Sequence, residues 1–96
     1  MKHWYLIKTK SKQEDIAIFN LENQNFHVYC PHALISNKNV ALFPGYIFIQ
    51  LDKDTQNWSP IRSTKGVLHF IRFGLSYAKI PDNIIEFIKT NELNTA

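Results

Sequence analysis

The longest apolar segment of the chain covers residues 42–52, and both of its alternating faces carry large apolar groups. The residues on one face are Phe43, Ile47, Ile49 and Leu51. The opposite face carries the aromatic rings of Tyr46 and Phe48. Because β-structure favours aromatic and β-branched residues, the segment predicts a central strand. A strand exposed on one side alternates apolar with polar residues, so both faces of this strand must be covered, by the chain itself or by another molecule.

Alternating apolar positions predict further strands over residues 4–9, 26–30 and 67–73, with a short one at 78–80. Pro31 ends the second of these because proline lacks the backbone N–H that a strand donates. Residues 31–41 are expected to form a loop.

Helical signals occur at three places. Ser11 and Glu14 have the spacing of a capping box, which predicts a helix over residues 12–23. Pro60 after Ser59 predicts a short helix that ends before Gly66, and a last helix begins near Pro81. Residues 91–96 are expected to be a frayed tail. The element order predicts one α+β domain over residues 1–90, with an antiparallel four-stranded sheet flanked by helices in a split βαβ-like sandwich.

The composition of the chain narrows its function. The 96 residues carry a formal net charge of +3, which is compatible with nucleic-acid binding without establishing it. The single cysteine, Cys30, excludes an internal disulfide and fits a reducing cytosol. No apolar run reaches the roughly 20 residues of a membrane span, so we expect a cytoplasmic protein without membrane contact.

The titratable residues do not form a recognisable catalytic or metal site. Four histidines and one cysteine are present, and no pair has metal-ligand spacing. Cys30 lies near His27 and His32 in the sequence and resembles a thiol–imidazole pair, but nothing in the sequence orients it. We therefore expect no enzymatic activity, no cofactor and no metal.

Two surfaces remain as candidates for binding. Lysines cluster at the first strand–helix junction and around the second helix, where they form either one phosphate-binding patch or an ordinary solvated surface. Trp58 is either a base-stacking residue or a packing residue at the start of the second helix. Leu6, Tyr46 and Phe48 form an apolar patch that either a partner or the last helix covers.

Several segments together resemble the N-terminal domain of the NusG family: Trp4-Tyr5, residues 42–48, residues 64–67 and residues 70–74. The segment 64–74 resembles in particular the operon-specific RfaH branch of that family. The resemblance implies a transcription elongation and antitermination factor that binds RNA polymerase and suppresses pausing and termination in specific operons. Family members normally continue through a linker into a KOW domain, and in this sequence we expect residues 91–96 to be the start of the missing linker, with no KOW domain. We also expect a monomer that associates with the nucleoid through transcribing polymerase.

The resemblance assigns roles to residues at matching motif positions. Contact with the clamp helices of the largest polymerase subunit falls to Leu6, Phe43, Tyr46, Phe48, Phe73, Ile85 and Ile88. Contact with the second-largest subunit falls to Asn57, Trp58 and Ser59. Matching motif positions assign contact with the non-template DNA strand to Lys10, Thr64 and Lys65. The basic clusters add Lys12 and Arg62 to this set. The alternative is a generic single-stranded nucleic-acid-binding module of split βαβ type that stacks bases on Tyr46 and Phe48, and a third is a domain that dimerises through the apolar patch.

Overall fold

The computed structural model describes residues 1–94 and contains an antiparallel five-stranded sheet. Its main path runs β2 (His27–Tyr29), β5 (Tyr46–Asp52), β1 (Lys2–Thr9) and β6 (Val67–Phe70). The fifth strand, β9 (Lys79–Ile80), pairs with the first half of β1. The α+β class and the antiparallel sheet are confirmed, and the sheet gains one strand over the expected four because β9 joins it.

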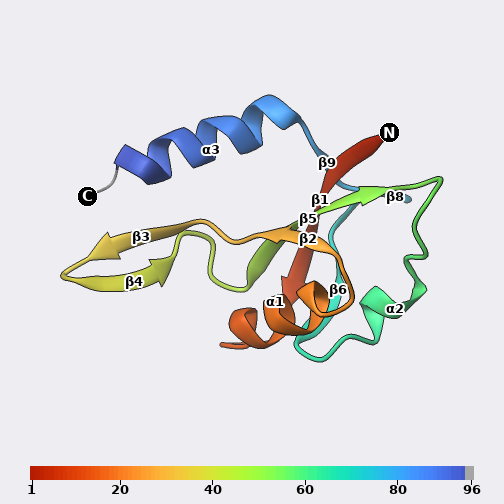
Figure 1. The fold of residues 1–96 in the computed structure, drawn as a ribbon, viewed down its shortest axis with the longest axis horizontal. Coiled ribbons are helices and arrows are strands. Elements are labelled where there is room, and N and C mark those ends of the chain that lie inside the picture. Colours follow the sequence, from red (N-terminus) through yellow and green to blue (C-terminus); the bar gives the residue numbers. More distant parts are fainter. Residues whose placement is uncertain (95–96) are drawn as a thin grey trace.

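Both faces of the sheet are covered by helices of the same chain (Figure 1). Helices α1 (Glu14–Glu22) and α2 (Ser59–Arg62) lie on one side, and α3 (Asp82–Asn94) lies on the other. The first side buries a core of Tyr5, Ile7, Ala17, Leu21, Phe26, Ile47, Ile49, Leu51, Ile61, Val67 and Phe70. The second side buries a smaller core of Trp4, Phe48 and Ile85. The two apolar faces of β5 therefore need no second molecule to cover them.

The central strand is shorter than the sequence pattern predicts. It begins at Tyr46, because Pro44 and Gly45 turn the chain and the Tyr46 N–H bonds the Phe43 oxygen at 3.0 Å. Gly45 has a φ of +85°, a conformation that glycine adopts without strain. The turn brings the Phe43 ring to the same face of the sheet as Phe48, not to the face of Ile47.

The predicted strand over 67–73 is also interrupted. β6 stops at Phe70, and the Ile71 N–H bonds the Leu6 oxygen at 2.9 Å. A small hairpin of β7 (Arg72–Phe73) and β8 (Ser76–Tyr77) then leaves the sheet. The chain rejoins it when the Ala78 N–H bonds the Ile71 oxygen at 3.0 Å. β6 and β9 thus act as one edge strand with a hairpin inserted into it.

The expected loop at 31–41 is wrong, because this segment forms a second hairpin. β3 (His32–Ile35) pairs with β4 (Lys38–Ala41) through a two-residue turn. Ser36 and Asn37 adopt φ values of +52° and +66°, the left-handed conformation of a tight hairpin turn. Figure 1 shows this hairpin extending from the sheet beneath the end of α3.

The capping box at the start of α1 does not form. Lys12 adopts a positive φ of +58°, the helix begins at Glu14, and no side chain caps its N-terminus. The Glu14 carboxylate accepts a hydrogen bond from the Gly45 N–H at 3.0 Å instead. The carboxylate therefore joins α1 to the turn before β5.

The predicted frayed tail is wrong for residues 91–94, which continue α3; residues 95–96 lie outside the described part of the chain. The Glu92 carboxylate accepts hydrogen bonds from the Tyr29 hydroxyl at 2.6 Å and from the His32 backbone N–H. Burial and then the bond to Glu92 raise the pKa of Tyr29 well above its usual range. The end of α3 is thereby tied to the base of the β3–β4 hairpin. Within residues 1–94, no helix is long and apolar enough to cross a membrane.

Candidate partner face and basic patch

The partner face is the set of residues to which the sequence assigned clamp contact, and the structure divides it into exposed and buried members. Phe73 and Phe43 are 69% and 43% exposed. Leu6, Tyr46 and Ile88 are half-buried. The remaining two, Phe48 and Ile85, are 6% and 0% exposed. They are core residues, so the prediction that they contact a partner directly is corrected.

The buried members support the exposed ones. Phe48 and Ile85 pack with Trp4 beneath α3, and Leu6 and Ile88 pack against this cluster from its margin. The Phe43 ring meets Phe48 edge-on, with ring centroids 6.1 Å apart. An anchored aromatic ring loses little conformational entropy when it enters a partner's pocket.

Tyr46 is held by a cation. The Lys8 ammonium lies 4.4 Å from the centre of the Tyr46 ring, and it also lies close against Gly45. A cation over an aromatic face at an exposed site contributes about 0.5–1 kcal/mol. Lys8 therefore fixes Tyr46 at the edge of the partner face.

The last helix covers the second core with only part of its apolar side chains, and two of the others point outward. Ile85 and Ile88 face the second core, whereas Ile84 and Phe87 are exposed, Phe87 by 67%. Residues three apart share one side of a helix, so Ile84 and Phe87 form a second apolar stripe. This spacing was visible in the sequence, but the side that faces the sheet was not.

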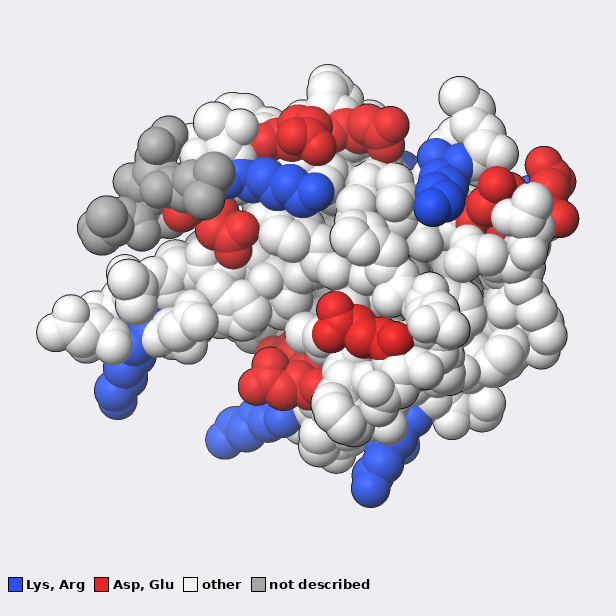
Figure 2. Space-filling model, viewed as in Figure 1, with Lys and Arg blue, Asp and Glu red and all other residues white. Residues whose placement is uncertain are grey.

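The basic patch comprises the exposed Lys10, Lys12, Arg62 and Lys65. The Lys10 N–H bonds the Gly66 oxygen at 2.9 Å, which joins the β1–α1 junction to the segment after α2. Lysines distant in the sequence therefore lie along one side of the molecule. Figure 2 shows basic side chains projecting from the lower edge, on the side of α1, with acidic side chains beside them.

Thr64 was expected to contact DNA, and the structure corrects this. Its side chain is buried, donating to the Pro60 oxygen at 2.8 Å and accepting from the Gln24 side-chain amide at 2.9 Å. Both functions of the hydroxyl are already occupied. Thr64 thus positions the segment that carries Lys65.

Residues 57–59 lead into α2, which starts at Ser59. The Asn57 side-chain oxygen accepts hydrogen bonds from the Ser59 N–H and hydroxyl at 3.1 and 3.0 Å, which forms a turn just before α2. Asn57 and Ser59 are exposed, while Trp58 is half-buried. The Trp58 ring packs edge-on against Tyr5, with centroids 4.9 Å apart. Its indole N–H donates to the backbone carbonyl oxygen of Asp52 at 3.4 Å. Trp58 is therefore in large part a packing residue.

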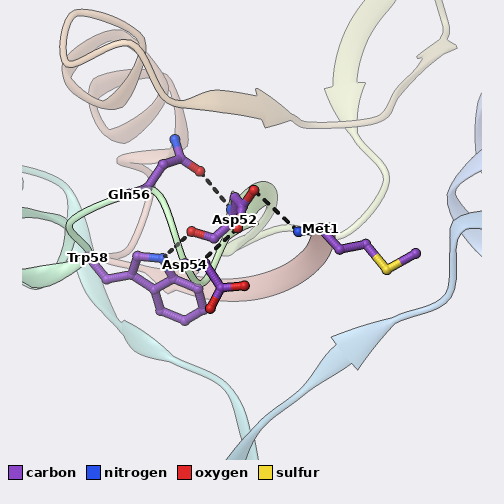
Figure 3. Close-up of polar contacts among 5 residues, drawn as sticks. All are labelled: Met1, Asp52, Asp54, Gln56 and Trp58. Atoms are coloured by element: carbon purple, nitrogen blue, oxygen red, sulfur yellow. Dashed lines mark hydrogen bonds and ion pairs between the residues drawn. The ribbon is translucent and has the colours of Figure 1, made fainter.

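Asp52 organises the turn that presents Trp58 (Figure 3). Its carboxylate accepts from the Asp54 N–H at 2.9 Å and from the Met1 ammonium at 3.3 Å, and its own N–H bonds Gln56 at 2.7 Å. The Asp54 N–H, followed by the Met1 ammonium, lowers the pKa of Asp52 despite an opposing effect of burial. The turn is consequently fixed by hydrogen bonds on several sides.

The cysteine and the metal-binding side chains that were considered as catalytic candidates do not form a catalytic or metal site in the described residues. Burial, followed by the charges of Glu14, Asp15 and Glu92, raises the pKa of Cys30 to about 11. A thiol that stays protonated near neutral pH is a poor nucleophile. Within residues 1–94, no cluster of three or more His, Cys, Asp or Glu side chains is arranged to hold a metal ion.

An α+β domain with an aromatic partner face and a separate basic patch is of the class that binds other macromolecules. The family model "Transcription termination factor nusG" matches residues 2–89, and the chain belongs to this family. The match confirms the NusG resemblance. The finer resemblance to RfaH has no support among the relatives, which are NusG proteins.

Individual relatives agree with this assignment. The chain is 27% identical to the transcription termination/antitermination protein NusG of Thermus thermophilus, over 94% of the chain and 62% of the relative. It is 32% identical to NusG of Helicobacter pylori, over 74% of the chain and 51% of the relative. Thermotoga maritima NusG has a similar structure, with a TM-score of 0.66 and 21% identity over 92% of this chain and 55% of that one, which shows a shared fold. The chain therefore spans about half to three-fifths of the length of these relatives. The relatives are transcription proteins, which fits the expectation that this domain is not an enzyme.

Proposed function

We propose that this domain binds bacterial RNA polymerase through the partner face and thereby suppresses pausing and termination. The observation that carries the proposal is that Phe43 and Phe73 are exposed and Tyr46 is half-buried, in a chain of the NusG family. The bound element is the pair of clamp helices of the largest subunit. Aromatic anchors that enter a helical partner's grooves supply most of the binding energy in such interfaces.

The outer stripe of α3 enlarges this face. Ile84 and Phe87 lie on the same helix as Ile85 and Ile88, which pack into the core beneath the face. Phe48 and Ile85 contribute rigidity without touching the partner. We therefore assign direct contact to Leu6, Phe43, Tyr46, Phe73 and Ile88, with Ile84 and Phe87 as additions.

The basic patch gives the domain a second contact, with the non-template DNA strand. Lys10, Lys12, Arg62 and Lys65 are exposed and carry the charge that phosphates require. A domain that holds both polymerase and DNA favours the closed, active clamp if it binds that state better than the paused one. A difference of about 1.4 kcal/mol changes the pause equilibrium tenfold.

Two finer proposals are tested separately. Contact of residues 57–59 with the second-largest subunit is supported by the exposed Asn57 and Ser59. Action restricted to particular operons requires recognition of bases. Transcription assays on templates that differ only in the pause-site sequence would reveal it as a template-dependent reduction in pausing, and an equal reduction on all templates would contradict it.

Calorimetric titration of the isolated clamp-helix fragment tests the main proposal. We expect Phe43→Ala and Tyr46→Ala each to weaken binding by about fivefold or more, since an anchor residue contributes at least about 1 kcal/mol. Leu34→Ala is the matched control, because Leu34 is an exposed apolar residue on the β3–β4 hairpin outside the partner face. No binding by a folded parent, or equal losses in all three variants, would refute the proposal.

Phe48→Ala is not a suitable probe of contact. Removal of a buried phenylalanine ring destabilises a protein by about 3–5 kcal/mol, so weaker binding would report partial unfolding. Its burial also argues against the alternative of a base-stacking platform on Tyr46 and Phe48, because a buried ring offers no face to a base.

A further inference from the structure

Two adjoining hollows lie where β5 ends and α2 begins, and neither belongs to the partner face. Their volumes are about 590 and 560 Å³. Trp58, Ser59 and Tyr77 line both hollows, so the two aromatic side chains form a ridge between them. We call Trp58 and Tyr77 the aromatic ridge.

The charged side chains that line the two hollows are all cationic, while Asp52 and Asp54 lie beside Trp58 in the turn before α2 (Figure 3). Lys53 and Lys79 line the first hollow and Arg62 lines the second. Among the described residues that line the two hollows, none is Asp or Glu. The guanidinium of Arg72 lies 4.9 Å from the centre of the Tyr77 ring and adds a further cation. This concentration of cations attracts an anionic ligand.

The ridge is rigid and its surroundings offer hydrogen bonds. Trp58 and Tyr77 stack at 5.8 Å, and Phe70 stacks on Tyr77 at 4.5 Å from beneath. Both ridge residues are half-buried. The Gln56 side-chain oxygen is engaged by the Asp52 N–H, which leaves its amide nitrogen as a donor at the first hollow (Figure 3).

We propose that the two hollows bind single-stranded nucleic acid, with a base against the exposed part of Trp58, since Phe70 and the Arg72 guanidinium already lie against the Tyr77 ring. Lys53, Lys79 and Arg62 neutralise the phosphates. Aromatic rings combined with a cationic, carboxylate-free lining are the pattern of single-strand binding, whereas a protein segment would need no excess of cations. This site goes beyond the function proposed above, because it lies apart from Lys10, Lys12 and Lys65. It shares Arg62 with the basic patch, and it shares residues 57–59 with the segment proposed to contact the second-largest subunit, so the two partners would compete for it.

Fluorine NMR of the chain labelled with 5-fluorotryptophan tests the site directly. The chain has only two tryptophans, Trp4 under α3 and Trp58 at the ridge, so each gives one resonance. Trp58→Phe assigns the two signals. On titration with a short oligothymidylate we expect the Trp58 signal to shift and the Trp4 signal to stay in place.

A pair of charge-matched double variants locates the phosphates. We expect Lys53→Ala with Lys79→Ala to weaken oligothymidylate binding by at least about fivefold and to reduce the salt slope of log K by about 1.4, or about 0.7 per phosphate contact. All four lysines of the two double variants are exposed, so folding is not at risk. Lys10→Ala with Lys12→Ala is the control and should leave the Trp58 shift intact.

The outcomes separate this inference from the proposed function. If the oligonucleotide binds, only Lys10 and Lys12 matter and Trp58 does not shift, the inference is overturned while the DNA contact of the basic patch stands. If a fragment of the second-largest polymerase subunit shifts Trp58 and the oligonucleotide does not, the hollows bind protein and the inference is likewise overturned. Clamp-helix binding is measured independently by calorimetry.

Discussion

At the scale of single residues, Gly66 fixes the distance between α1 and the segment that follows α2. Its φ is +93°, and an added Cβ would lie 2.7 Å from the Ala17 backbone nitrogen and 3.0 Å from the Ala17 Cα. Neither atom can move without moving α1. The junction that carries Lys10 and Lys65 therefore depends on the absence of a side chain at this position.

We predict that Gly66→Ala destabilises the fold by more than Gly74→Ala, as measured by urea unfolding. Gly74 also has a positive φ, of +66°, but an added Cβ there meets no atom within 4 Å. Gly74→Ala should cost about 1–2 kcal/mol for the backbone conformation alone, and Gly66→Ala should add about 1–3 kcal/mol for the forced overlap. Equal effects of the two changes would contradict the close approach to Ala17.

Cys30 predicts a dependence of stability on alkaline pH. Its pKa rises from 9.0 to about 11 in the folded chain, so between these values the folded state binds more protons than the unfolded state. Stability then falls as pH rises, since the slope follows the protons bound by the unfolded state minus those bound by the folded state. The contribution is complete below about pH 9 and lost above about pH 11.

The measurement is the difference in urea midpoint between the parent and Cys30→Ala at pH 8 and pH 11. Tyr5 and Tyr29 also have raised pKa values and titrate in both proteins, so their contributions cancel in the difference apart from the effect of the Cys30 charge on the pKa of Tyr29. The advantage of the parent should shrink at the higher pH. An unchanged difference would show that the thiol ionises as freely in the folded chain as in the unfolded one.

At the scale of elements, one carboxylate links α3 to the β3–β4 hairpin. One carboxylate oxygen of Glu92 accepts a hydrogen bond from the Tyr29 hydroxyl of β2, and the other accepts one from the His32 backbone N–H of β3. The Lys89 ammonium strengthens the same junction, lying 5.4 Å from the Trp4 ring centre and 5.2 Å from that of Tyr29. The hairpin and the helix are consequently expected to open together.

We predict that Glu92→Gln speeds hydrogen exchange of the β3–β4 amides about fivefold, the effect of losing one hydrogen bond of about 1 kcal/mol. A glutamine keeps one acceptor oxygen and replaces the other with a donor. Glu86→Gln makes the same change of charge at an exposed position of α3 and should leave the hairpin unaffected. Faster exchange in both variants would assign the effect to charge and not to the hydrogen bonds.

The β3–β4 hairpin shows why the sequence pattern did not predict every strand. Short strands such as β3 and β4 contain too few residues for a period to stand out, and Ser36 at a positive φ gives no turn signal of its own. The capping box failed for a related reason: Glu14 finds the Gly45 N–H, which is distant in sequence but adjacent in space. Local motifs predict local partners, and here a distant partner was available.

At the scale of the whole molecule, the proposed binding surfaces differ in chemistry. The partner face is apolar, and the aromatic ridge and basic patch depend on cations. We predict that binding to the clamp-helix fragment changes little with salt, whereas oligonucleotide binding falls steeply, because it releases counterions. Calorimetry and anisotropy at several salt concentrations measure both slopes on the same preparation. A clamp-helix slope as steep as that of the oligonucleotide would mean that polymerase binding is electrostatic.

The sequence by itself determined the antiparallel α+β class, the two apolar faces of β5 and the family. These depend on alternation and on motif order, which are local and survive in any correctly folded arrangement. Only the tertiary structure decided which apolar residues stay exposed: it buried Phe48 and Ile85, turned Phe87 outward, and engaged the Thr64 hydroxyl. Exposure depends on how α3 lies over the sheet and how distant segments meet, and a pattern along the chain does not contain that information.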